Sequence, residues 1–153
     1  MIYDSEVDTR LHIDRVRFLL SKCAINLLER GVKHDASKLE PPEKAAFDLA
    51  GDRHLAVTYG SEEYLASLAE LETALDHHYA NNSHHPQHYP NGINGMSLFD
   101  LLEMLMDWKA TAERHAGSTD VVRFLEIGRA RFGLSDQLLE ILTNTAKELG
   151  WLP

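Results

Sequence analysis

Apolar residues recur at steps of three and four along nearly the whole 153-residue chain, which is the spacing of one face of an α-helix. No segment alternates β-branched and polar residues between turns, as a half-buried strand would. The sequence therefore predicts an all-α fold. Because it shows no internal repeat, linker or low-complexity segment, we expect one domain over residues 1–153, a bundle of about six helices.

Capping and turn residues set the expected bounds of these helices. Gly31 is placed to end the first helix in a left-handed cap, and Pro41-Pro42 to open the second. The first helix carries an inward stripe of His12, Val16, Leu19, Cys23 and Leu27. The expected ranges are about Ser5–Arg30, a helix from Glu43, a helix capped by Ser61 whose stripe ends in His78, then Ser97–His115, Asp120–Phe132 and Ser135–Leu149. Ser97 with Asp100 three residues later resembles a capping box, with Asp in place of Glu or Gln, and Gly133 and Gly150 are expected to end the last two helices.

Charge and cysteine content exclude several classes of partner. The net charge is −9 and no run of Lys or Arg occurs, so long nucleic acids are not expected as partners. The lone Cys23 rules out an internal disulfide and a thiolate-rich zinc site, so any metal must be held by His, Asp and Glu. The N-terminus resembles no signal peptide and no apolar run could span a bilayer. We expect a cytoplasmic protein with no membrane partner.

Histidines are unevenly distributed. The chain has nine, and five of them lie between positions 77 and 88: His77, His78, His84, His85 and His88. The stretch 81–95 lacks periodicity and is rich in Asn, His, Pro and Gly, which predicts a loop of about fifteen residues. Loops of that length in a compact domain are usually functional or disordered. The histidine content favours function here, against the alternative of a His-rich surface loop.

Two further groups of residues carry metal-binding chemistry. His34-Asp35 follows the first helix, and an imidazole beside a carboxylate suits a borderline divalent ion. The expected helix Ser97–His115 is apolar around most of its circumference and leaves a narrow acidic strip of Asp100, Glu103 and Asp107. A buried carboxylate must be paired or bound to a metal. The alternatives are a surface His-Asp pair and a solvated acidic face.

These residues resemble a known pattern. His12, His34-Asp35 and Asp107 in an all-α chain resemble the H…HD…D signature of the HD-domain metal-dependent phosphohydrolases. The likeness covers about 100 residues and extends to Lys38, because His34-Asp35-Ala36-Ser37-Lys38-Leu39 is similar to the H-D-I-G-K-L form of the motif, with Ser37 where Gly often stands. The segment His78…Asn82-Ser83-His84-His85-Pro86 also resembles small proteins of phage and bacterial genomes, a likeness that implies no activity.

The first resemblance implies a set of metal ligands. One divalent ion would be held by His12, His34, Asp35 and Asp107, with Glu103 and Asp100 as alternatives to Asp107. Members with two metals add histidines between the HD pair and the last Asp, an interval that holds His78, His84 and His85 here. His78 is favoured over His77 because it lies on the inward stripe of its helix. Of His84 and His85, one can bind metal and the other substrate.

The resemblance also implies an activity. We expect one or two divalent ions (Zn, Mn, Co, Mg or Fe) to promote hydrolysis of a phosphoester or phosphoanhydride in a small substrate, most plausibly a nucleotide. Asp35, His84 and His85 would take part in catalysis, and Lys38 would contact a phosphate. Two alternatives stay open: an HD-fold di-iron oxygenase, and a non-catalytic metal-stabilised module. A homodimer through the apolar C-terminal helices is also possible.

Overall fold

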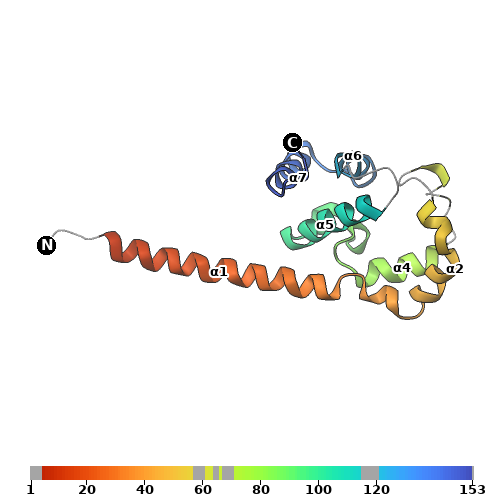
Figure 1. Cartoon of the computed structure of the whole chain (residues 1–153), viewed down its shortest axis with the longest axis horizontal. Helices are drawn as coiled ribbons and strands as arrows, with labels where there is room; N and C mark the ends of the chain where they lie inside the picture. Colours follow the sequence, from red (N-terminus) through yellow and green to blue (C-terminus); the bar gives the residue numbers. More distant parts are fainter. Residues whose placement is uncertain (1–4, 57–60, 64–65, 67–70, 115–120, 153) are drawn as a thin grey trace. The chain divides into compact units, whose positions relative to one another are not determined.

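The computed structural model describes residues 5–56, 61–63, 66, 71–114 and 121–152. These ranges hold six α-helices, three short 3₁₀ helices and no β-strand (Figure 1). The prediction of an all-α fold is confirmed. Backbone contacts divide the chain into two units, Met1–His34 and Asp35–Pro153, and each is described by itself. None of the helices within the described ranges is long and apolar enough to cross a membrane.

The first unit consists mainly of one helix, α1 (Ser5–Lys33), in which no residue is buried. Its predicted end at Gly31 was wrong: the helix runs through Gly31 to Lys33, and the left-handed backbone conformation falls on Asp35 instead. Within the described residues of this unit the stripe that includes His12 has no second element to pack against, so its inward position stays a prediction. Periodicity identifies a stripe on a helix but does not say which element covers it.

The second unit contains the remaining helices. The prediction that Pro41-Pro42 precedes a helix is confirmed, and Gly133 (φ 69°) and Gly150 (φ 73°) follow two C-terminal helices in the left-handed conformation, as expected. Part of the predicted third helix, residues 64–65 and 67–70, lies outside the described residues. The elements are η1 (Ala36–Leu39), α2 (Glu43–Ala56), α4 (Glu72–Asn81), η2 (Pro86–His88), η3 (Gly92–Gly95), α5 (Leu98–Arg114), α6 (Val121–Phe132) and α7 (Asp136–Glu148).

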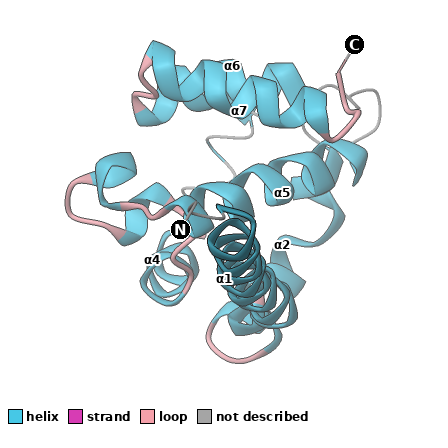
Figure 2. Cartoon of the chain, turned by 90° about the vertical axis from the view of Figure 1, so that its left-hand side faces the viewer, coloured by secondary structure: helices cyan, strands magenta, loops and turns pink. Residues whose placement is uncertain are grey.

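The hydrophobic core lies where α5, α6 and α7 meet. In Figure 2 α6 and α7 run side by side next to α5. Each helix buries one apolar face, as its periodicity predicts. The side chains in the core are Met104, Leu105, Trp108, Ala112, Val121, Phe124, Leu125, Leu134, Leu142 and Ala146. This packing fixes α5, whose other side carries the acidic strip.

The start of α5 is closed by a capping box. The backbone N–H of Ser97 donates to Oδ2 of Asp100 at 2.8 Å, and the backbone N–H of Asp100 is 3.2 Å from Oγ of Ser97. The two residues thereby satisfy backbone donors that a helix start leaves without partners. The capping box expected from Ser97 and Asp100 is confirmed, with Asp in the position usually taken by Glu or Gln.

A substitution at Gly128 on α6 can test how tightly this core is packed. An added Cβ would lie 2.3 Å from Cη2 of Trp108, which is only 5% exposed. Gly128→Ala should therefore lower the free energy of unfolding by about 1–2 kcal/mol, because overpacking outweighs the gain in helix propensity. Chemical denaturation measures the change. Gly31→Ala is the matched control, since nothing lies within 4 Å of its added Cβ. Equal stability of the two variants would contradict the packing argument.

Candidate metal centre

Asp35 opens the second unit and has an uncommon backbone conformation. Its φ of 55° and ψ of 15° are left-handed, which among non-glycine residues Asn and Asp tolerate best. It lies at the N-cap of η1, and its side chain is 21% exposed. Left-handed non-glycine residues cost free energy and cluster at functional sites. We therefore expect the Asp35 carboxylate to make specific contacts.

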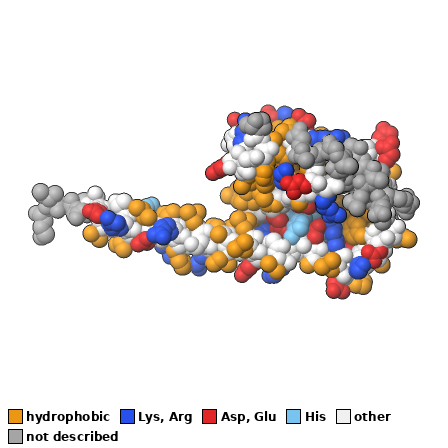
Figure 3. Space-filling view, in the orientation of Figure 1, with side chains coloured by type: hydrophobic (Ala, Val, Ile, Leu, Met, Phe, Trp, Pro, Cys, Tyr) orange, Lys and Arg blue, Asp and Glu red, His pale blue; other side chains and the backbone are white. Residues whose placement is uncertain are grey.

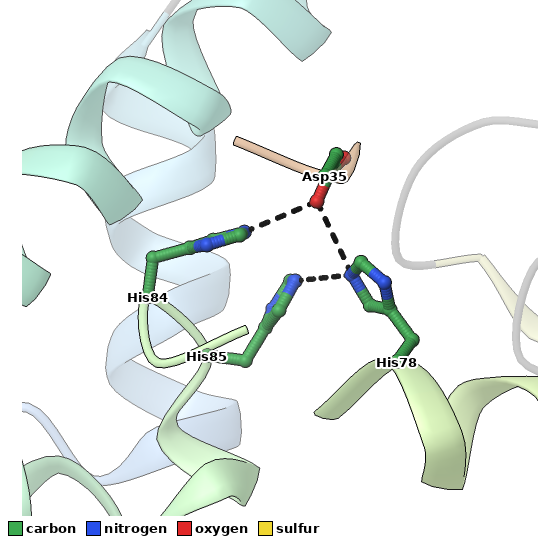
Figure 4. Close-up of side chains that lie close together, drawn as sticks. All are labelled: Asp35, His78, His84 and His85. Carbon is green, nitrogen blue, oxygen red and sulfur yellow. Dashed lines mark hydrogen bonds and ion pairs between the residues drawn. The ribbon is translucent and has the colours of Figure 1, made fainter. Parts of the chain in front are cut away.

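The Asp35 carboxylate lies close to three histidines. Oδ1 of Asp35 is 3.3 Å from Nε2 of His78 and 3.5 Å from Nε2 of His84, and Nε2 of His78 is 2.8 Å from Nε2 of His85 (Figure 4). One ligand atom from each of the four residues lies within 4.8 Å of all the others. We call these four residues the Asp–His₃ cluster. Its members come from the segment before η1, from α4, and from the loop between α4 and η2.

Two of the histidines are supported by carboxylates on their far side. Nδ1 of His78 is 2.8 Å from Oε2 of Glu43, and Nδ1 of His84 is 3.2 Å from Oε1 of Glu103. Because an ionised carboxylate only accepts hydrogen bonds, both imidazoles donate through Nδ1–H. Their Nε2 lone pairs are then directed into the Asp–His₃ cluster. Histidines that ligate metals almost always have such a partner on the other ring nitrogen.

Electrostatics keeps His78 uncharged. Burial lowers the pKa of His78, as does the nearby Lys38 ammonium, and together they outweigh the opposing effects of Asp35 and Glu43. Burial raises the pKa of Glu43, but hydrogen bonds from His77, Ser37 and His78 outweigh it and bring that pKa below its ordinary value. A neutral imidazole backed by an ionised carboxylate is the form in which histidine binds a metal.

The cluster matches the requirements of a transition-metal site. Two atoms bound to one ion at about 2.0–2.1 Å lie about 2.9–3.4 Å apart for angles between 90° and 109°. The observed separations of 2.8, 3.3 and 3.5 Å are close to that interval. Three imidazoles and one carboxylate suit zinc, iron, cobalt or manganese better than Mg²⁺ or Ca²⁺, which prefer oxygen ligands. The residues present therefore fit such an ion.

Hydrogen bonds hold the histidine loop in place. Nδ2 of Asn82 donates to Oγ of Ser37 at 2.7 Å and to the carbonyl of His78 at 2.8 Å. Ser37 thus connects η1 to the end of α4 through its hydroxyl group. Glycine, which often stands at this position of the motif, could not make that contact. On the other side of the loop, Oγ of Ser83 and the hydroxyl of Tyr89 donate to the buried Asp100 at 2.7 and 2.8 Å.

One side of the cluster is open to solvent. His85 is partly exposed, and the side chain of Lys38 is 37% exposed. Nζ of Lys38 donates to Oδ2 of Asp35 at 2.6 Å and lies 5.5 Å from the centre of the Phe47 ring. In Figure 3 pale-blue histidine atoms are visible on the second unit among acidic and basic side chains. The exposed edge of the cluster is therefore at His85, and Lys38 extends from Asp35 to solvent.

The structure brings several of the predicted site residues together. Asp35, His78, His84 and His85 form the cluster, and the inward position of His78 is confirmed, whereas the side chain of His77 is 41% exposed. Asp107 has a carboxylate oxygen within 4.8 Å of one on Asp35, so its predicted role as a ligand stays open. Glu103 supports His84, and Asp100 is engaged in holding the loop.

The remaining predicted ligands belong to the first unit. His12 lies on α1 and His34 is the last residue of that unit, directly before Asp35, and their roles as ligands stay predictions. Sequence reasoning missed the role of Glu43. An acidic residue in the first turn of a helix is explained by the helix dipole alone, so its position gave no signal of a contact with histidines more than 30 residues away.

The fold and the cluster define an all-α protein with a candidate metal centre of histidine and carboxylate ligands. Comparison with protein families adds one finding: residues 1–148 match the model of the family of unknown function DUF5662, and the chain belongs to that family. No curated protein and no solved structure gives a significant match.

The contribution of Asp100 to holding the histidine loop can be tested by measuring the stability of the protein at acidic pH. Hydrogen bonds from Ser97, Ser83 and Tyr89 outweigh burial and lower the pKa of Asp100 far below its ordinary 3.8. A group whose pKa is lower in the folded state stabilises the fold above its unfolded pKa and loses that contribution as the pH falls. Asp100→Asn should cost about 1.5–3 kcal/mol at pH 7.

Denaturation between pH 7 and pH 3 measures this contribution. The wild type should lose stability below about pH 5, and Asp100→Asn should lose less over the same interval, because the variant lacks the carboxylate. Parallel pH profiles of the two proteins would show that Asp100 does not stabilise the fold in this way. Asp136→Asn is the control, since the Asp136 side chain is 86% exposed.

Proposed function

We propose that this protein is a metal-dependent phosphohydrolase. The observation that carries the proposal is the Asp–His₃ cluster, in which three imidazole nitrogens and a carboxylate oxygen converge within 4.8 Å. The resemblance to the H…HD…D pattern supports the same chemistry; the likeness is carried by His12, His34-Asp35 and Asp107 and extends to Lys38. Asp35 belongs both to that motif and to the cluster.

Charge balance supports a divalent ion. Three carboxylates contact the cluster or its histidines, namely Asp35, Glu43 and Glu103, and the side chains of Glu43 and Glu103 are 0% and 13% exposed. Lys38 brings one positive charge to Asp35. Carboxylates removed from water require compensation. One divalent cation would neutralise the negative charge of these carboxylates that Lys38 does not balance.

The chemistry would be hydrolysis at a phosphorus atom. A bound ion would supply Lewis acidity, lowering the pKa of a water molecule and polarising a phosphoryl oxygen. Lys38 would bind a phosphate oxygen through its ammonium, which Asp35 and Phe47 hold at the edge of the cluster. His85, which is partly exposed, would contact the same substrate. Asp35 and His84 would orient the reacting groups.

Aromatic side chains beside the cluster favour a nucleotide as the substrate. The Phe47 ring lies 6.5 Å from the His78 ring, and the Tyr79 ring lies 5.2 Å from the His85 ring, measured between centroids. Both aromatic residues are partly exposed. Such rings can stack on a base while Lys38 holds the phosphate.

The first test combines metal analysis with turnover. Purified protein loaded with Zn²⁺, Mn²⁺, Co²⁺ or Fe²⁺ should release phosphate from a chromogenic phosphomonoester or from members of a nucleotide panel. Asp35→Ala and His84→Ala should lower metal content and reduce turnover by at least 100-fold, because each removes a ligand. His88→Ala is the control, since Nδ1 of His88 contacts the backbone carbonyl of Tyr79 at 2.8 Å.

The outcomes separate the alternatives. Phosphate release by both metal-deficient variants at the wild-type rate would contradict the proposal. Substrate-dependent oxygen uptake by the iron-loaded protein, without phosphate release, would indicate an oxygenase. Full metal content without turnover across the panel would indicate a non-catalytic module.

Lys38 provides a second test. Lys38→Met keeps much of the side-chain length but removes the ammonium, so we expect kcat/KM for a phosphomonoester to fall about 10- to 100-fold, a loss of about 1.4–2.7 kcal/mol in transition-state stabilisation. Metal content should stay at the wild-type value. Lys44→Met is the matched control, because the exposed Lys44 pairs with Asp48 on α2. Equal kcat/KM in both variants would exclude a phosphate contact by Lys38.

A further inference from the structure

Glu43 links two adjacent histidines through one buried carboxylate. Oε1 is 2.7 Å from Nδ1 of His77, Oε2 is 2.8 Å from Nδ1 of His78, and the side chain of Glu43 is 0% exposed. Glu43 stands in the first turn of α2, and both histidines lie on α4. We infer that Glu43 is a positioning residue for the metal centre, which sets the tautomer of His78 and is itself held by His77.

The inference rests on the proposed metal site and deepens it. Because a carboxylate accepts hydrogen bonds at both oxygens, Glu43 can take the Nδ1–H of His77 and the Nδ1–H of His78 together. His78 then keeps an unprotonated Nε2 directed toward Asp35 and His85. The contacts therefore run inward from the partly exposed His77 to Glu43, and from Glu43 to His78, which is a member of the Asp–His₃ cluster.

The geometry explains why this position requires a carboxylate. A glutamine has nearly the same shape, but one end of its amide is an NH₂ group that only donates. Facing two Nδ1–H groups, the amide oxygen could accept a hydrogen bond from one histidine, but the NH₂ group would point its hydrogens at the Nδ1–H of the other. One imidazole would then have to turn or move its proton to Nε2, and in His78 that proton would occupy the lone pair that binds the metal.

His77 has a role in this arrangement that needs no contact with the metal. Its side chain is 41% exposed, yet its Nδ1 makes a hydrogen bond of 2.7 Å to a fully buried oxygen. This contact fixes the rotation of the Glu43 carboxylate and therefore the direction of Oε2 toward His78. A histidine that served only as a surface group would have no effect on metal affinity.

Co²⁺ binding measures the proposed positioning directly. The probe is Co²⁺ alone, titrated into the metal-free full-length chain and followed by the visible ligand-field absorption, with competition against a chelator for affinity. Glu43→Gln should weaken Co²⁺ binding roughly 10- to 100-fold, the usual cost of losing a partner of a ligating histidine. Its absorption spectrum should also change, because His78 is displaced. Glu72→Gln, an exposed change of equal charge on α4, should match the wild type.

A second variant keeps the test decisive if Glu43→Gln fails to fold. His77→Ala removes an exposed partner of Glu43 and should weaken Co²⁺ binding about 3- to 10-fold, with circular dichroism unchanged. In the Glu43→Gln background the same change should add little, because the two residues act through one contact. Wild-type affinity and spectrum in both variants would overturn the inference. Failure of the wild type to bind any metal ion would instead overturn the proposed function.

Discussion

The arrangement of the second unit depends on one requirement, that carboxylates withdrawn from water must be compensated. Asp35 is compensated by Lys38, whose ammonium donates to Oδ2 at 2.6 Å. Glu43, which is fully buried, accepts from two histidines. Because an isolated buried charge costs several kcal/mol, these contacts constrain where η1, α2 and α4 can lie relative to one another. The cluster therefore contributes to the fold as well as to any chemistry.

Helix α5 connects this polar site to the hydrophobic core. One side of it buries Leu105 and Trp108 among α6 and α7, and the other carries Asp100 and Glu103. Asp100 closes the start of the helix and also accepts hydrogen bonds from the loop that bears His84. Close packing of the apolar side leaves α5 little freedom to shift. The positions of the loop and of Glu103 are consequently set by the core.

The extent to which the sequence predicts this structure follows from the range of each interaction. The start of α2, the Ser97–Asp100 capping box and the inward face of His78 depend on residues a few positions apart, so local patterns predict them. The contact of Glu43 with His77 and His78 joins two helices across a turn, and no local pattern contains it. The inward position of His12 stays a prediction for a related reason, because a stripe of residues on a helix does not identify the element that covers it.

The geometry also bears on the cost of binding an ion. His78 and His84 already direct Nε2 inward, because carboxylates hold their Nδ1–H groups, so little side-chain entropy remains to be lost on binding. At 2.8 Å the two Nε2 atoms of His78 and His85 cannot both present lone pairs to each other, so a proton lies between them when no ion is bound. Burial and Lys38 disfavour a charged His78, whose Nδ1–H faces Glu43, so that proton is the Nε2–H of a neutral His85. A metal ion at the proposed site would take the place of this hydrogen bond, at the cost of moving one proton on His85.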